Sequence, residues 1–313
     1  MSQFLLCSLS LPSVLLFLIG LWGHSNFAFA SPASGNNKDR SIHIFTAGDI
    51  ADCRKNSAND SIAAKTAAII ERESVQAAQN YILTLGDSTY PFGTVAEFRD
   101  CYGPTWGKFK ASTLPTPGNH EYGVPHAQAY FAYFGEIAGS ANQSYYKKQL
   151  GTWLILSLNS NLRGAEMETQ VQWLTNELKQ NKSACTLAFW HHPRFSSGGH
   201  GNNGFMQAIW EQLANAKVDV VLSAHDHDYE RLSPLNAEGQ IDRLLGLRSF
   251  VVGTGGAGLT PMFFPKSITE VRQNEFHGVL RLRLFSASYD WDFLPIEGSS
   301  FKDRGQATCH SVF

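Results

Sequence analysis

The chain reads Tyr81-Ile82-Leu83-Thr84-Leu85-Gly86-Asp87-Ser88-Thr89-Tyr90 where a short apolar run meets polar side chains. Residues 81–85 have the length and the aromatic and β-branched content of a buried strand. Gly86 ends the run, so Asp87 and Tyr90 follow at the carboxyl end of the strand, where α/β sheets present ligands. Because a carboxylate and a phenol are hard oxygen donors, the segment predicts a strand that delivers metal ligands.

The same arrangement recurs along the chain, with metal-binding side chains close to the ends of short apolar runs. These further candidates are Asp49, Asn119 with His120, His191, and His225 with His227. Strands are expected at 42–46, 81–85, 153–158, 186–190 and 218–222, and helical spacing is found at 61–79, 166–180 and 204–216. This alternation of strand and helix is typical of an α/β protein.

The last third of the chain has a different character. Strand patterns occur at 249–253, 278–284 and 289–293, and helix signals are scarce. A second sheet is therefore expected.

Taken together, five segments carry the ligand pattern. They are Ala47-Gly48-Asp49-Ile50-Ala51, Gly86-Asp87-Ser88-Thr89-Tyr90, Gly118-Asn119-His120-Glu121, Phe189-Trp190-His191-His192-Pro193 and Ala224-His225-Asp226-His227. In order and chemistry they resemble the calcineurin-like metallophosphoesterases, and Tyr90 narrows the resemblance to the purple acid phosphatase branch. Ala51 and Ala224 stand where that family usually has glycine, and a position that needs positive φ would strain an alanine.

The resemblance implies a fold and a metal centre. The fold would be α/β, a four-layer αββα sandwich of two mixed β-sheets flanked by helices. The first metal would be bound by Asp49, Asp87, Tyr90 and His227, and the second by Asp87, Asn119, His191 and His225, with Asp87 as the bridge. A phenolate favours ferric iron, so the expected cofactors are two metal ions, ferric iron plus zinc, manganese or ferrous iron.

Two further histidines are expected to be catalytic. His120 and His200 match family histidines that meet the substrate, where an imidazole stabilises phosphoryl oxygens or protonates the leaving group. The alternative for His200 is a merely solvated position in the loop 196–201. His192 is as suitable a ligand as His191 by residue type, but strand alternation predicts that it faces the opposite side.

Other residues are expected around the cleft without a defined role. Tyr122 and His126 would line it, and Tyr229 and Glu230 would support the ligands. Residues 253–258 match the GxGxxG fingerprint of a dinucleotide site, but prolines follow where such a site needs a helix. We expect a tight loop near the metal cleft instead.

The composition bounds the class of protein. The chain has 313 residues, of which 43% are hydrophobic and 17% charged, which suits one large domain. Its formal net charge is −2 without a block of like charge, so no nucleic-acid partner is expected. The expected partner is a small phosphate-ester substrate, and no protein partner is implied.

The amino terminus predicts export. Residues 4–22 are almost wholly apolar and Ala28-Phe29-Ala30 precede Ser31, so residues 1–30 have the pattern of a cleaved signal peptide. A flexible polar segment at 31–40 and a single catalytic domain at 41–313 would follow. The protein would then be secreted, extracellular or periplasmic, without stable membrane association. The segment before the apolar run lacks Lys and Arg, so an uncleaved membrane anchor stays open as the alternative.

Cleavage would leave four cysteines in an oxidising compartment, which favours two disulfide bonds. Three pairings are possible, and Cys53–Cys101 with Cys185–Cys309 is the favoured one.

The expected function is hydrolysis of phosphate monoesters by a metal-bound hydroxide at a dinuclear centre, with an acidic to neutral rate optimum. The alternatives are a phosphodiesterase or nucleotidase of the same fold, or a catalytically silent, metal-bearing binding protein.

Overall fold

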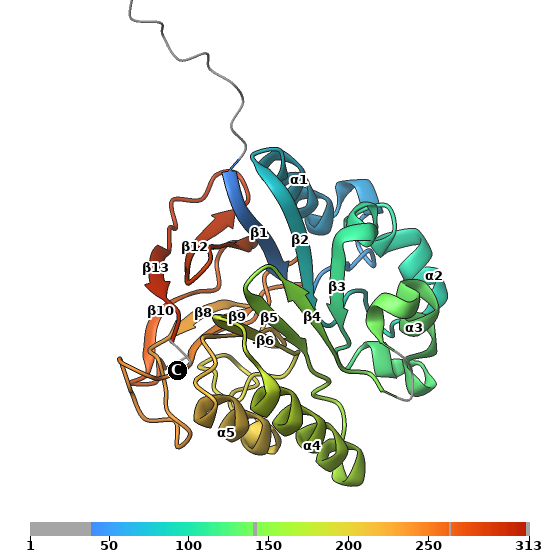
Figure 1. Cartoon of the computed structure of the whole chain (residues 1–313). Helices are drawn as coiled ribbons and strands as arrows, with labels where there is room; N and C mark the ends of the chain where they lie inside the picture. Colours follow the sequence, from blue (N-terminus) through green and yellow to red (C-terminus); the bar gives the residue numbers. More distant parts are fainter. Residues whose placement is uncertain (1–38, 140–142, 263, 311–313) are drawn as a thin grey trace, which may run out of the picture. The chain divides into compact units, whose positions relative to one another are not determined.

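Two mixed β-sheets form the centre of the protein in a computed structural model, which describes residues 39–139, 143–262 and 264–310 (Figure 1). The six-stranded sheet has the order β13 (Arg304–Thr308), β12 (Ser288–Pro295), β11 (Gly278–Leu284), β1 (Asp39–Ala47), β2 (Ala77–Leu85) and β3 (Thr113–Thr116). The seven-stranded sheet has the order β10 (Thr269–Gln273), β8 (Tyr229–Leu232), β9 (Arg248–Val252), β7 (Val220–Ser223), β6 (Cys185–Phe189), β5 (Trp153–Ser157) and β4 (Tyr146–Leu150).

Helices cover the outer faces. They are α1 (Ile62–Ser74), α2 (Val95–Glu97), α3 (Gln128–Phe134), α4 (Gly164–Gln180) and α5 (Gln207–Asn215). A π-helical turn, η2 (Phe98–Tyr102), and six 3-10 turns complete the elements: η1 (Ala58–Asp60), η3 (Trp106–Ser112), η4 (Glu121–Gly123), η5 (Pro125–Ala127), η6 (Gly135–Ala138) and η7 (Gly204–Met206).

The side chains of the strands alternate between two apolar cores. In β5, Ile155 joins the main core, whereas Leu154 and Leu156 join a second core with α4 and α5. In β6, Phe189 likewise joins the main core, and Ala188 joins the second core. This period of two is the geometry of a sheet that is covered on both faces. Figure 1 shows α4 and α5 together against the seven-stranded sheet and α1 beside β1 and β2. The predicted αββα sandwich is therefore confirmed.

Parallel pairing brings the ligand-bearing ends together. β1, β2 and β3 are parallel neighbours, and so are β5, β6, β7 and β9. Because the carboxyl ends of parallel strands meet at one edge, the residues that follow β1, β2, β3, β6 and β7 can converge on a single site.

Several element boundaries differ from those predicted. The helix expected at 61–79 ends at Ser74, because Ala77 and Gln79 pair with β1, and this pairing overrides helical composition. β1 begins at Asp39, so the polar segment expected at 31–40 contributes its last two residues to a strand. Residues 31–38 and the predicted signal at 1–30 lie outside the described residues.

Both favoured disulfide bonds are present, Cys53–Cys101 and Cys185–Cys309. The second bond ties the segment after β13 to the first residue of β6. Among the described residues, no helix combines the length and the apolar character that crossing a membrane requires.

Candidate metal centre

Three candidate ligands adopt the left-handed backbone conformation directly after their strands. Asp49 follows β1 with φ 57°, Asp87 follows β2 with φ 48°, and His225 follows β7 with φ 69°. This conformation costs a residue other than glycine about 1–3 kcal/mol, and such strain is concentrated at functional sites. Ala51 and Ala224, which replace the family's glycines, are not among the residues with positive φ. The two departures therefore cause no backbone strain.

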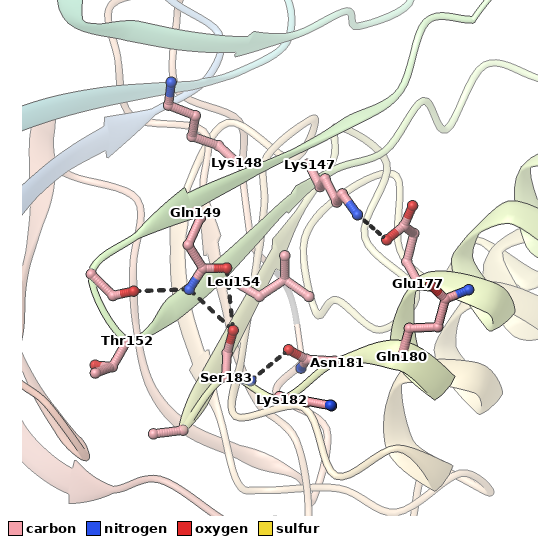
Figure 2. Close-up of a pocket in the computed structure, with 12 residues that line it drawn as sticks. Lys147, Lys148, Gln149, Thr152, Leu154, Glu177, Gln180, Asn181, Lys182 and Ser183 are labelled. Carbon is pink, nitrogen blue, oxygen red and sulfur yellow. Dashed lines mark hydrogen bonds and ion pairs between the residues drawn. The ribbon is translucent and has the colours of Figure 1, made fainter.

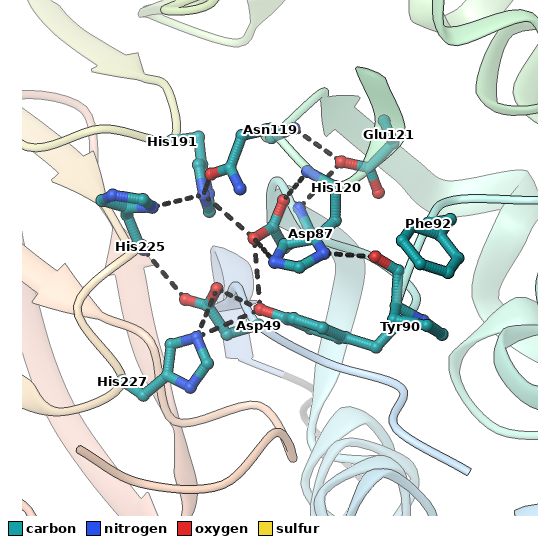
Figure 3. Close-up of polar contacts among 12 residues, drawn as sticks. Asp49, Asp87, Tyr90, Phe92, Asn119, His120, Glu121, His191, His225 and His227 are labelled. Carbon is teal, nitrogen blue, oxygen red and sulfur yellow. Dashed lines mark hydrogen bonds and ion pairs between the residues drawn. The ribbon is translucent and has the colours of Figure 1, made fainter. Parts of the chain in front are cut away.

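The first ligand group surrounds the phenol of Tyr90 (Figure 3). Its oxygen lies 2.7 Å from Asp49 Oδ1, 3.1 Å from Asp87 Oδ2 and 3.1 Å from His227 Nε2. His227 Nε2 is in turn 3.3 Å from Asp49 Oδ1. Four donor atoms from three separate segments of the chain therefore face one point.

The second group surrounds His191 Nε2. This nitrogen lies 3.0 Å from Asn119 Oδ1, 3.2 Å from Asp87 Oδ2 and 3.1 Å from His225 Nδ1. Because Asp87 Oδ2 belongs to both groups, Asp87 occupies the position that a bridging carboxylate requires. Adjacent ligands around an ion with bonds of about 2.1 Å lie roughly 3.0–3.4 Å apart, which matches this spacing.

Backbone carbonyls fix the orientation of two of the imidazoles. His191 Nδ1 donates to Leu85 O at 2.8 Å, and His227 Nδ1 donates to Gly258 O at 2.7 Å. Each ring therefore directs Nε2 inward, as metal-binding histidines do when their other nitrogen is hydrogen bonded. In a neutral His191, the lone pair of Nε2 would face the oxygens of Asp87 and Asn119. Only a proton or a cation between these acceptors makes the arrangement favourable.

The pKa values of the candidate ligands also indicate that the site needs a proton or a cation between its acceptors. Burial alone would raise the pKa of Asp49, but His227 and His191 lower it below its usual range. Burial opposes charge on His191 and His227, yet Asp87 and Asp49 raise the pKa of each imidazole to about 9. The buried carboxylates thus retain protons on histidines that must be neutral to bind a metal, so a cation would replace those protons. Burial and both carboxylates raise the pKa of Tyr90, which a bound cation would reverse.

Glu121 is a buried residue of the site that the sequence reasoning missed. Its Oε2 accepts the backbone N–H of Asp87 at 2.9 Å and that of Gly118 at 2.6 Å, and its Oε1 accepts the N–H of Ser88 at 2.6 Å. Burial and the charge of Asp87 raise the pKa of Glu121 to about 7. The signal was its place two residues after Asn119 in the third segment, where an acidic residue holds the backbone of Asp87.

The glycine-rich residues 253–258 form the expected tight loop, and no helix begins between residues 253 and 262. A Cβ atom on Gly253 would lie 2.0 Å from Asp226 O and 2.7 Å from Asp49 Oδ2. Ala257 N donates to Asp49 O at 2.8 Å. The loop therefore lies against Asp49 and Asp226, and Gly253 leaves room for this close approach.

The two expected catalytic histidines each border a different ligand, His120 beside Asp87 and His200 beside His225. His120 Nδ1 donates to Pro91 O at 2.5 Å, and its Nε2 is 3.8 Å from Asp87 Oδ2. The ring of the exposed His200 lies 4.3 Å, centroid to centroid, from that of His225, and the two ring planes are tilted by 32°. Asp226 holds the His200 loop, because its Oδ1 accepts the N–H of His200 at 2.6 Å.

The prediction that His192 faces away from His191 was wrong. β6 ends at Phe189, so strand alternation no longer applies at these residues. The ring of His192 lies 4.9 Å from that of His191 and 4.4 Å from that of His225. Its Nδ1 is 2.8 Å from Ser160 Oγ. Burial lowers the pKa of His192, and the neighbouring His191 lowers it further.

Two other expectations need correction or detail. Tyr229 does not support the ligands, because its hydroxyl donates to Asp303 Oδ2 at 2.7 Å in the core. Glu230 accepts the N–H of Ser197 at 2.7 Å and so holds the loop that carries His200. Tyr122 and His126 line a hollow of 220 Å³ next to the turn that contains His120.

A larger hollow, of 700 Å³, lies away from these ligands (Figure 2). It is formed by the β4–β5 hairpin and the end of α4, and it includes the Lys147–Glu177 ion pair and the Gln149–Ser183 hydrogen bonds. None of the predicted ligands lines it. The volume of a hollow would therefore point to a place without candidate ligands, whereas the metal-binding donor atoms lie at the carboxyl ends of the strands.

The fold and the two ligand groups define a metallophosphoesterase-type site. The family model of the calcineurin-like phosphoesterases matches residues 41–229, which is more than half of the chain. The chain belongs to this family, and its relatives place it on the purple acid phosphatase-like branch. The predicted family resemblance is thus confirmed.

Curated relatives include plant and human phosphatases. Purple acid phosphatase 21 of Arabidopsis thaliana is 28% identical over 262 residues, which cover 68% of this chain and 57% of that protein. Acid phosphatase type 7 of Homo sapiens is 26% identical over 219 residues, which cover 57% of this chain and 49% of that protein. The chain spans about half of the length of these relatives.

Solved structures share the fold. Purple acid phosphatase PPD1 from yellow lupin (Lupinus luteus) seeds superposes with a TM-score of 0.69 at 15% identity, covering 87% of this chain and 54% of that one. GAP50, the anchor in the inner membrane complex of Plasmodium, superposes with a TM-score of 0.68 at 11% identity, covering 87% of this chain and 90% of that one. Because such different proteins share the fold, function has to be argued from the site.

Proposed function

We propose that the protein hydrolyses small phosphate monoesters at a dinuclear metal centre. One observation carries this proposal: Asp87 Oδ2 lies at the junction of two donor groups, and His191 Nε2 faces acceptors that only a proton or cation can satisfy. The hard oxygens of Asp49 and Tyr90 fit a ferric ion, and the amide and imidazoles of the other group fit a divalent ion such as zinc, manganese or ferrous iron. When bound, the ions acidify water and neutralise charge on a phosphate ester.

The protein's own residues supply the proton and the orientation. Water adds to phosphorus while the ester P–O bond breaks, and the leaving oxygen must then take up a proton. His120 and His200 are the candidate donors, because both border the ligand groups and remain accessible. Holding Nδ1 of His120 on Pro91 O leaves Nε2 to face the substrate.

The decisive assay compares 4-nitrophenyl phosphate with bis(4-nitrophenyl) phosphate, which share a leaving group. We expect the monoester to be hydrolysed faster, with an acidic to neutral optimum, and Asp87→Asn to lose most of the turnover. Faster diester hydrolysis would favour the phosphodiesterase alternative. An inactive chain with intact metal sites would favour the silent binding protein.

We also propose that residues 41–313 form the catalytic domain of an exported protein, either extracellular or periplasmic. The two disulfide bonds support export, because such bonds persist in oxidising compartments. Sequencing the amino terminus of the mature protein tests the cleavage. A terminus at Ser31 is expected, and a retained Met1 in the membrane fraction would indicate an anchor.

A further inference from the structure

A polar hollow of 220 Å³ opens beside the turn that carries Asn119 and His120. Tyr122 forms one wall, and its backbone N–H donates to Asn119 O at 3.1 Å, so the wall is one turn of chain from a predicted metal ligand. The Tyr122 hydroxyl is fixed by Asn159 Nδ2 at 2.7 Å. The hollow therefore adjoins the turn that carries a predicted metal ligand and a predicted catalytic histidine.

The size of the hollow limits what it can hold. Its volume lies below the roughly 300–1,000 Å³ of sites for drug-sized ligands. At about 30 Å³ for each liquid water, it holds the equivalent of about seven waters. One sugar ring or a short polyol fits this volume.

The lining determines the chemistry. Glu166 and His126 are exposed at the hollow, and neither side chain makes a hydrogen bond or ion pair with another described residue. A carboxylate accepts hydrogen bonds from hydroxyl groups, and an imidazole can donate or accept them. The phenol rings of Tyr122 and Tyr145 add flat apolar surfaces for C–H groups.

The same lining disfavours other occupants. Leu162 is the one aliphatic side chain among the residues that line the hollow, so a purely apolar group would leave the carboxylate unpaired. An ammonium group has only donors, so it cannot accept a hydrogen bond from the imidazole N–H of His126. A neutral, hydroxylated group satisfies both side chains.

We propose that this hollow binds the leaving group of the substrate and selects small hydroxylated esters, such as hexose or polyol monophosphates. The proposal rests on the proposed phosphomonoesterase function. Glu166 lies in the first turn of α4, and Thr169, three residues later, shares its face of the helix and also lines the hollow.

The test compares two primary monoesters, glucose 6-phosphate and n-hexyl phosphate, with phosphoethanolamine as the cationic probe. The wild-type protein should show a higher kcat/KM for glucose 6-phosphate than for the other two. Glu166→Gln should lower the ratio of kcat/KM for glucose 6-phosphate to that for hexyl phosphate by about tenfold, and His126→Ala should act in the same direction. Glu168→Gln, on the same helix but outside the lining, is the matched control and should leave the ratio unchanged.

The failures of the two proposals are distinguishable. Suppose that the wild-type protein hydrolyses 4-nitrophenyl phosphate, and that Glu166→Gln and Glu168→Gln give the same ratio of kcat/KM for glucose 6-phosphate to that for hexyl phosphate. This result overturns the role of the hollow and leaves the phosphatase function standing. A preference for hexyl phosphate or phosphoethanolamine also overturns that role. A metal-loaded protein that hydrolyses none of these esters overturns both proposals. Thermal melting of each variant verifies that the exposed substitutions leave the fold intact.

Discussion

Replacing Glu121 with alanine should destabilise the metal-free protein, although Glu121 is neither a predicted ligand nor a predicted catalyst. Its carboxylate is fully buried and accepts three backbone N–H groups, from Asp87, Ser88 and Gly118. The substitution leaves these donors buried without a partner, at the very residues that set the backbone of the bridging ligand.

The magnitude follows from two opposing contributions. Hydrogen bonds to a charged group contribute about 1.5–3 kcal/mol each, so three of them contribute about 4.5–9 kcal/mol. Burial and the charge of Asp87 raise the pKa of Glu121 from 4.5 to about 7, so keeping the carboxylate ionised in the core costs on the order of 3 kcal/mol above neutral pH. The difference is a net loss of about 1–6 kcal/mol, with a central value of about 3 kcal/mol.

Urea denaturation at pH 8 in the presence of a chelator measures this loss, because metal binding then makes no contribution. The exposed Glu136→Ala is the control for removing a carboxylate. We expect the free energy of unfolding to fall by about 3 kcal/mol in Glu121→Ala and to change little in Glu136→Ala. Equal values for the two variants would refute the reasoning that the buried carboxylate supports the backbone.

Four further predictions concern the residues of the site. Because the pKa values of His191 and His227 are about 9 and the pKa of Tyr90 is raised, all three side chains hold their protons at pH 7 without metal. Calorimetry in two buffers should show about three protons released on metal loading, two from the imidazoles and one from the phenol, and no release would contradict this account. The raised pKa values of the two imidazoles also stabilise the metal-free fold below about pH 6.5, and this contribution is lost as the pH rises through 9, so chelated protein should melt at a lower temperature at pH 10 than at pH 7. Tyr90→Phe should lower the iron content and abolish any phenolate-to-iron absorption in the visible range, and an unchanged spectrum would contradict iron at Tyr90. Asp226→Asn should lower kcat about tenfold through the His200 loop without changing metal content; loss of metal would show that Asp226 supports the ligands instead.

The sequence predicted the parts of the fold that depend on local pattern. Strands such as 81–85 are continuous apolar runs, and the ligand that follows each run marks its carboxyl end. β3 was missed because it is four residues long and contains Pro115, which an edge strand tolerates. β13 was missed because its residues alternate between half-buried and exposed positions and are mostly polar.

The site was predictable by residue type but not in its supporting contacts. The metal-binding pattern can be recognised in the sequence because each candidate ligand carries a characteristic donor atom. The supporting contacts depend on the conformation of the loops that follow β2 and β6. They are the hydrogen bonds that Glu121 accepts from three N–H groups and the proximity of His192 to His225. Such turns are set by tertiary packing, for which strand alternation gives no rule.

The most direct test of the central claim is the metal content of each chain, measured by mass spectrometry on mature protein purified without chelators. The two donor groups that share Asp87 predict two metal ions per chain, one of them iron, with a loss of at least one ion in Asp87→Asn. A wild-type protein with no metal, or with one loosely held ion, would contradict the dinuclear centre.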